Sequence, residues 1–126
     1  MQNIPKSLRY WFIAHFLIDM LFAIPLIVAP LYTLTLFGFS GENTLTARLV
    51  GAALMGIGLT SLLENKKGRD SYSTLLTLKI IWSIFAEIAI LISIMEGAPN
   101  TAWLMFAIFV IFTITWIKYR IDLGKK

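Results

Sequence analysis

Five ionisable side chains interrupt the long apolar stretches of this chain, and they are the residues whose types could do chemistry: His15, Asp19, Arg48, Lys79 and Glu87. If those stretches cross a lipid bilayer, each charge is costly there and is expected to face a bundle interior or a wet cavity. Carboxyl and imidazole groups in such a place can exchange protons or act as general acid and base. The same groups can also serve only as ion pairs and hydrogen bonds that hold helices in register.

The spacing of these residues puts them on two helix faces. His15 and Asp19 are four positions apart, so they share one face of an α-helix. Lys79, Ser83 and Glu87 share a face of another helix for the same reason. If the two faces meet, they form a polar seam that could line a pocket or a proton path, made of His15, Asp19, Arg48, Lys79, Ser83 and Glu87.

The depth of each charge in the membrane predicts its partner. With a rise of about 1.5 Å per residue, Asp19 falls near mid-membrane, and Lys79 falls level with His15, about 6 Å further inward. Glu87 lies about 12 Å further outward than Lys79, and Arg48 lies near the outer surface. We therefore expect Lys79 to pair with Asp19 in the inner half of the membrane. Arg48 is expected to pair with Glu87 in the outer half.

Composition indicates that these helices are membrane spans. The chain has 126 residues, of which 58% are hydrophobic and 14% are charged, whereas about a quarter of residues are charged in soluble domains. Four apolar stretches cover residues 10–28, 46–63, 73–95 and 101–117, and spans of about 20 residues each leave room only for short loops. We therefore expect one domain, residues 1–126, with the all-α fold of an integral membrane four-helix bundle.

Positive charge predicts the orientation of the bundle. Only Arg48 lies toward one side of the spans, and the other ten Lys and Arg residues lie at or nearer the opposite side. Because cytoplasmic loops carry the excess of Lys and Arg, both termini are expected in the cytoplasm of a prokaryotic cell. The ten residues are Lys6, Arg9, Lys66, Lys67, Arg69, Lys79, Lys118, Arg120, Lys125 and Lys126.

Prolines interrupt the first span, and small residues recur in the second. Pro25 and Pro30 disturb the first helix, so residues 31–39 are expected to form a separate kinked or interfacial segment. Small residues in the second span favour close helix packing, within one chain in preference to a homodimer. They are Gly51, Ala52, Gly56 and Gly58. Trp103 and Trp116 lie near the two ends of the last span, as interfacial aromatic residues do.

Several classes of site are excluded by residue type. The chain has no cysteine and one histidine, which removes disulfides, thiolate metal sites and thiol redox chemistry. No phosphate-binding loop, dinucleotide fingerprint or nucleophile elbow is present. The net charge of +4 flanks the spans, so we expect contact with the lipid bilayer and none with nucleic acid. We assign no catalytic residue, no metal ligand and no cofactor.

Short motifs over residues 20–119 resemble the DoxX-like superfamily of small four-span membrane proteins. The similar features are Pro25 and Pro30, Leu36-Phe37-Gly38, Ala47-Arg48-Leu49-Val50-Gly51-Ala52, Lys79-Ile80-Ile81-Trp82 and the closing Trp116. The resemblance implies a four-helix bundle and says little about activity. Some relatives are associated with quinone-linked sulfur oxidation or other membrane redox systems.

Three functions follow as hypotheses. The leading one is a non-enzymatic accessory subunit, or a bundle that binds a hydrophobic ligand such as a lipid or quinone, with a larger membrane complex or a second copy as partner. The alternative is a proton-coupled small-molecule transporter that uses Asp19 and Glu87. The second alternative is a membrane isomerase or redox-associated enzyme acting on a lipid-like substrate, with His15, Asp19 and Glu87 as acid and base.

Overall fold

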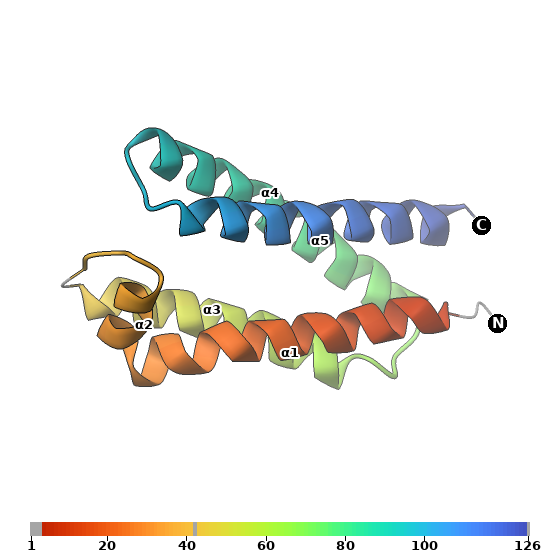
Figure 1. Cartoon of the computed structure of the whole chain (residues 1–126). Helices are drawn as coiled ribbons and strands as arrows, with labels where there is room; N and C mark the ends of the chain where they lie inside the picture. Colours follow the sequence, from red (N-terminus) through yellow and green to blue (C-terminus); the bar gives the residue numbers. More distant parts are fainter. Residues whose placement is uncertain (1–3, 42, 126) are drawn as a thin grey trace. The chain divides into compact units, whose positions relative to one another are not determined.

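The chain folds almost entirely into α-helices. The computed structural model describes residues 4–41 and 43–125. Within these ranges the helices are α1 (Lys6–Val28), α2 (Pro30–Leu36), α3 (Thr44–Leu63), α4 (Arg69–Met95) and α5 (Thr101–Gly124) (Figure 1). Four of them, α1, α3, α4 and α5, are long and apolar enough to cross a membrane. The predicted all-α class and the four membrane-length apolar helices are confirmed.

The helices are longer than the apolar stretches that predict them. α5 continues to Gly124, seven residues past the predicted end of the last span. Its 24 residues correspond to about 36 Å of helix, against a hydrocarbon layer of about 30 Å. Hydropathy marks only the apolar part of a helix, whereas charged residues beyond that part continue the backbone hydrogen bonding.

The first predicted span ends at a backbone break. α1 continues three residues past Pro25, and Ala29 then leaves the helical region with φ −135° and ψ 65°. Pro30 begins α2, where its missing N–H is not needed. The hydroxyl of Thr33 donates a hydrogen bond to the Ala29 carbonyl oxygen at 2.8 Å. The separate segment expected after the prolines is thus a seven-residue helix.

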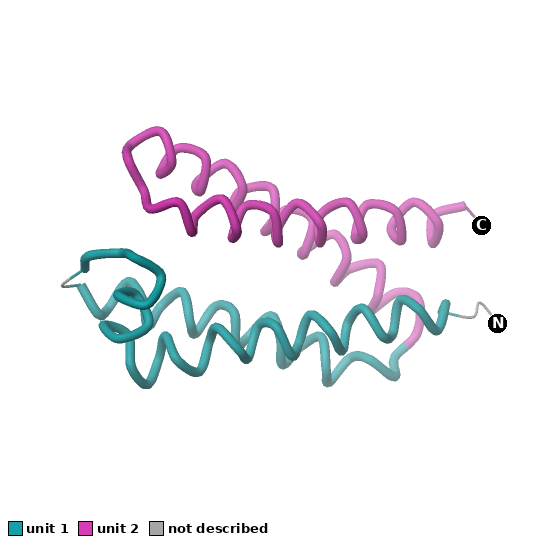
Figure 2. Tube along the Cα trace, in the orientation of Figure 1, with its two compact units in different colours: residues 1–67 teal, residues 68–126 magenta. Residues whose placement is uncertain are grey.

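The chain divides into two compact units (Figure 2). Unit 1 covers residues 1–67 and holds α1, α2 and α3, with α1 packed along α3. Unit 2 covers residues 68–126 and consists of α4 packed against α5. Each unit is a helical hairpin, and the single domain expected from the sequence stays a prediction.

Glycine permits the contact between α1 and α3. At Gly51, a Cβ atom would lie 2.8 Å from Ile27 Cγ1 and 3.0 Å from the backbone oxygen of Ala23. At Gly58, a Cβ atom would lie 2.9 Å from the Cβ of Asp19. Such distances are shorter than normal carbon contacts, so the helices approach this closely only because these side chains are hydrogen atoms.

Ala52 and Gly56 lie outside this contact, although the sequence predicts packing for them too. Both are exposed, and among the described residues no atom lies within 4 Å of a Cβ built at Gly56. At about 100° of rotation per residue, the two positions are turned roughly 100° to 140° around α3 from Gly51. The predicted packing role therefore does not apply to them in the α1–α3 contact.

Two arginines join the ends of α1 and α3. The guanidinium of Arg9 donates to the carbonyl oxygen of Asn65, and the Asn65 amide donates back to the Arg9 carbonyl oxygen at 2.9 Å. Near the other end, Arg48 Nε donates to the carbonyl oxygen of Ile27 at 3.1 Å. Ile27 lies in the last turn of α1, where carbonyl groups lack intrahelical partners. Asn65 lies in the turn that follows α3, and Arg9 supplies a donor to its carbonyl oxygen there.

Unit 2 uses its two arginines in the same way. The guanidinium of Arg69, at the start of α4, donates to the carbonyl oxygen of Leu123 in the last turn of α5. Arg120 Nε donates to the hydroxyl of Thr77 on α4 at 3.2 Å. Each of the four arginines of the chain therefore binds another segment of its own hairpin, in addition to its value as a topology signal.

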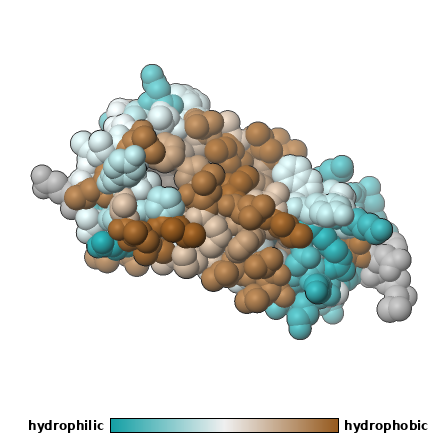
Figure 3. All heavy atoms as spheres, turned by 60° about the horizontal axis from the view of Figure 1, so that its bottom comes forward, coloured by the Kyte–Doolittle hydropathy of each residue, from teal (hydrophilic) through white to brown (hydrophobic). Residues whose placement is uncertain are grey.

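Most apolar side chains on these helices face outward. Of the most apolar 18-residue window in each membrane-length helix, between 17% and 22% is buried. Figure 3 shows apolar side chains over much of the visible surface, with hydrophilic ones gathered toward the helix ends. A surface of this kind fits a hydrocarbon environment, as in a multi-pass membrane protein.

The glycine contact yields a stability prediction. Gly51→Ala should lower the free energy of unfolding by about 1–3 kcal/mol, because the new methyl group meets a backbone oxygen that cannot rotate away. Gly56→Ala, in open space on the same helix, should be neutral or slightly stabilising. Thermal and SDS-induced unfolding in detergent would measure both, and equal effects of the two substitutions would contradict the described α1–α3 contact.

Candidate functional site

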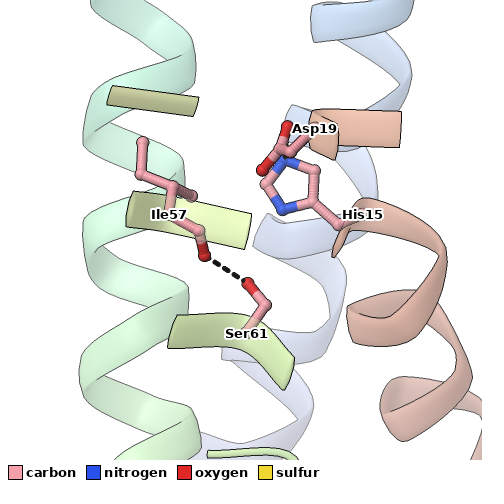
Figure 4. A network of polar contacts seen from close by, with 4 residues as sticks. All are labelled: His15, Asp19, Ile57 and Ser61. Carbon is pink, nitrogen blue, oxygen red and sulfur yellow. Dashed lines mark hydrogen bonds and ion pairs between the residues drawn. The ribbon is translucent and has the colours of Figure 1, made fainter. Parts of the chain in front are cut away.

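The first polar cluster lies in unit 1, on the face of α1 that packs against α3. His15 and Asp19 are 6% and 4% exposed, and His15 Nε2 lies 3.4 Å from Asp19 Oδ1. Both side chains point into the space beside α3 (Figure 4). The i, i+4 spacing read from the sequence thus corresponds to a direct contact between an imidazole and a carboxyl group.

Gly58 gives the Asp19 carboxyl group its space. A Cβ at Gly58 would lie 3.3 Å from Asp19 Oδ2 and 3.0 Å from Met20 Cε, besides its close approach to the Asp19 Cβ. The glycine therefore lets α3 cover Asp19 without displacing it. A side chain of any size at residue 58 would push the carboxyl group or the helix away.

Ser61 completes this cluster and was not predicted. It is fully buried, its hydroxyl donates to the Ile57 carbonyl oxygen at 2.9 Å, and it points toward His15 in Figure 4. Its oxygen lone pairs can accept a further hydrogen bond. The available signal was its spacing of three from Gly58, which puts both on one face of α3. We call His15, Asp19, Gly58 and Ser61 the histidine–aspartate cluster.

The second polar cluster lies in unit 2 and begins with Lys79. Lys79 is 1% exposed, and its Nζ lies 5.2 Å from the centre of the Trp116 ring on α5. Phe112 stacks on that ring, with centroids 5.4 Å apart. A cation over an indole face is attracted by the ring quadrupole. Trp116 is therefore a buried partner of Lys79, and its predicted depth near the membrane interface stays a prediction.

Glu87 lies eight residues after Lys79 on α4 and also contacts α5. The Thr113 hydroxyl is hydrogen-bonded to Glu87 Oε1, and it also lies 2.8 Å from the Phe109 carbonyl oxygen. A hydroxyl has one hydrogen to donate, so it cannot serve both oxygens fully. Thr113 therefore shares one hydrogen between a carboxyl oxygen of α4 and a backbone oxygen of its own helix.

The predicted seam residues thus divide between the two hairpins. Ser83, between Lys79 and Glu87 on α4, is buried at 3% exposure. Arg48 is exposed and binds a carbonyl oxygen of α1. The predicted pairs of Lys79 with Asp19 and of Arg48 with Glu87 would join the two units, and both stay predictions.

The two clusters offer different chemistry. The histidine–aspartate cluster combines a proton donor and acceptor in the imidazole, an acceptor or proton carrier in the carboxyl group and a serine hydroxyl. It can bind the polar end of a ligand or exchange a proton. The sequence did not predict Thr113 as a partner of Glu87 or Trp116 as a partner of Lys79. Charged residues stand out in a hydropathy profile, whereas threonine and tryptophan are ordinary residues of an apolar span.

Comparison with known proteins adds no assignment. No protein-family model, curated protein or solved structure matches the chain. The resemblance to the DoxX-like superfamily therefore stays a prediction from its short motifs. The function has to be argued from the two polar clusters and from the membrane-length helices that carry them.

Proposed function

We propose that this chain forms a DoxX-like four-helix bundle in the cytoplasmic membrane of a prokaryote, with both termini in the cytoplasm. The excess of Lys and Arg at the termini and in the loop at residues 64–70 supports this orientation. Polar side chains within membrane spans normally face the bundle interior. The polar faces of the two hairpins would then be turned inward, and the exposed apolar side chains toward lipid.

Within this bundle, the chain binds a hydrophobic ligand and performs no reaction of its own. The observation that carries the proposal is the buried His15–Asp19 contact in the middle of α1, with Gly58 leaving room for the carboxyl group. Ionisable residues within membrane spans are costly and usually mark a binding site or a proton path. The cluster would hold the polar head of the ligand while the spans contact its apolar body.

A purely structural role explains the His15–Asp19 contact less well. Buried charged pairs add little to stability compared with well-packed apolar residues of similar volume. The α1–α3 hairpin already has close glycine contacts, and Arg9 and Arg48 join its two ends. The hairpin therefore has sources of stability that do not need an imidazole and a carboxyl group.

The chemistry of the cluster limits the class of ligand. A head group with a hydroxyl or carbonyl oxygen can accept a hydrogen bond from His15 and, as a hydroxyl, donate one to Asp19. A long apolar body fits helices whose outward surfaces are apolar. Lipids and quinones combine both features. An accessory role in a larger membrane complex is compatible with such a ligand.

The proposed orientation can be tested with single cysteines, because the natural chain has none. Asn100→Cys, in the turn between α4 and α5, should react with a membrane-impermeant maleimide in intact cells. Gly68→Cys, in the loop before α4, should react only after the membrane is permeabilised. Both positions are exposed, so reactivity reports sidedness, and the reverse labelling pattern would contradict the proposed orientation.

The proposed ligand should be retained when the protein is extracted gently from its own membrane. Native mass spectrometry should detect an added mass on the wild-type chain. Asp19→Asn should weaken retention roughly tenfold to a hundredfold, since hydrogen bonds to charged groups contribute about 1.5–3 kcal/mol. Asp70→Asn is the matched control, because it removes the same charge at an exposed site in the first turn of α4.

The ligand experiment can fail in two ways. A wild-type chain that carries no added mass in its folded state would contradict the proposed binding function. Equal retention by wild type and Asp19→Asn would contradict the role of the histidine–aspartate cluster. A circular dichroism melt of each variant separates loss of ligand from loss of fold.

Proton-coupled transport is the second candidate, and Glu87 favours it. The Thr113 hydroxyl lies between Glu87 and the Phe109 carbonyl oxygen, so protonation of Glu87 would rearrange a contact between α4 and α5. Such a coupling between proton and helix contact is what a proton-driven carrier requires. Asp19 would provide the second carboxyl group of the path.

Proton flux into liposomes would test this candidate. With a pH-sensitive dye inside, Glu87→Gln should abolish flux, because the amide cannot carry the proton. Glu96→Gln, which removes an exposed carboxylate in the turn after α4, should leave flux unchanged. If liposomes that contain the wild-type protein take up protons no faster than empty liposomes, proton transport by the chain alone is excluded.

A further inference from the structure

The end of α5 combines positive charge and apolar surface on one exposed face. Lys118, Ile121 and Lys125 are all exposed and follow at intervals of three and four residues, so they lie on one side of the helix. Ile114, one turn earlier on the same side, is 64% exposed, and Ile121 is 54% exposed. The face changes from apolar to basic as the helix approaches its C-terminus.

We propose that this face binds the headgroup of an anionic phospholipid. Lys118 and Lys125 would bind the phosphate, and Ile114 and Ile121 would contact the acyl chains. The charges fit such a ligand, because the described residues from 118 to 125 carry three cations and one carboxylate. Basic residues next to a membrane span attract anionic lipids.

The length of α5 puts these lysines at the right depth. Lys118 is the eighteenth residue of the helix and Lys125 follows its last residue. At about 1.5 Å per residue, they lie roughly 26 and 36 Å from the helix start, around the edge of a hydrocarbon layer of about 30 Å. The long lysine side chains can reach the phosphate level from both positions.

The opposite face of this segment is held against α4. Tyr119 and Leu123 are buried. Arg69 binds the Leu123 carbonyl oxygen, and Arg120 binds the Thr77 hydroxyl. Contacts on both sides of Ile121 therefore keep the last turns of α5 helical, and a preformed helix loses less entropy when a lipid binds.

Both lysine ammonium groups remain accessible to a phosphate. Lys118 Nζ lies 5.6 Å from the centre of the Tyr119 ring, a contact that leaves its N–H groups able to donate. The side chain of Lys125 is 71% exposed, and its Nζ lies 3.8 Å from Asp122 Oδ1. An exposed ion pair of this kind contributes little, so a phosphate can replace the carboxylate as partner.

Lipid retention in nanodiscs of equal parts phosphatidylglycerol and phosphatidylcholine tests the proposal. Native mass spectrometry should find phosphatidylglycerol preferentially on the wild-type chain. The double variant Lys118→Gln/Lys125→Gln should retain it on the order of tenfold more weakly, from the loss of two cations. Lys66→Gln/Lys67→Gln is the matched control, because it removes two exposed cations from the loop before α4.

A second variant separates a lipid site from simple attraction of charge. Ile121→Asn keeps every charge but interrupts the apolar surface between the two lysines, so it should also weaken phosphatidylglycerol retention. The proposal is overturned if the two lipids are retained equally, or if both double variants lose retention equally. Full retention by Lys118→Gln/Lys125→Gln would overturn it as well.

Discussion

Backbone carbonyl groups in the last turn of a helix have no donor within that helix, and much of this structure follows from how they are satisfied. Arg9 and Arg48 bind carbonyl oxygens near the ends of α3 and α1, and Arg69 binds one in the last turn of α5. At the turn after α4, Gly97 takes φ 97°, which lets its own N–H and that of the next residue bond back to carbonyls of the final turn. Because these donors come from the same hairpin, each pair of helices closes its own ends.

Because each hairpin supplies the donors for its own helix ends, the polar residues inside the spans are not needed for that purpose. His15 and Asp19 are not needed to satisfy the backbone of α1 or to let α3 approach, since glycine and arginine do both. Their burial has a free-energy cost that an apolar pair would avoid. Lys79 differs, because its ammonium group lies over the face of the Trp116 ring, and this contact offsets part of that cost. The histidine–aspartate cluster is therefore the stronger candidate for a ligand site, and Lys79 with Trp116 has a clearer packing role.

The sequence predicted the charged members of both clusters but not their partners. Charges within an apolar span are conspicuous, and their spacing of four determines which helix face they share. Ser61, Thr113 and Trp116 are common residues in membrane helices, so nothing in the sequence distinguishes them from ordinary packing residues. They matter because the register between two helices brings them beside a charge, and small residues in a helix allow more than one register. Gly58 shows the same point, since its sequence context resembles that of Gly56, which has open space around it.

Sequence patterns were enough to predict the all-α class, the four membrane-length apolar helices, the separate segment after the prolines and the shared faces of His15 with Asp19 and of Lys79 with Ser83. These follow from local properties, namely hydropathy, the geometry of proline and the 3.6-residue period of the helix. Only the packed helices show that Gly51 and Gly58, but not Ala52 and Gly56, lie in the α1–α3 contact, that Trp116 lies buried against Lys79, and that arginines join the ends of each hairpin. Those features depend on the rotation and register of one helix against another. Side-chain packing sets both, and a period along one helix carries no information about them.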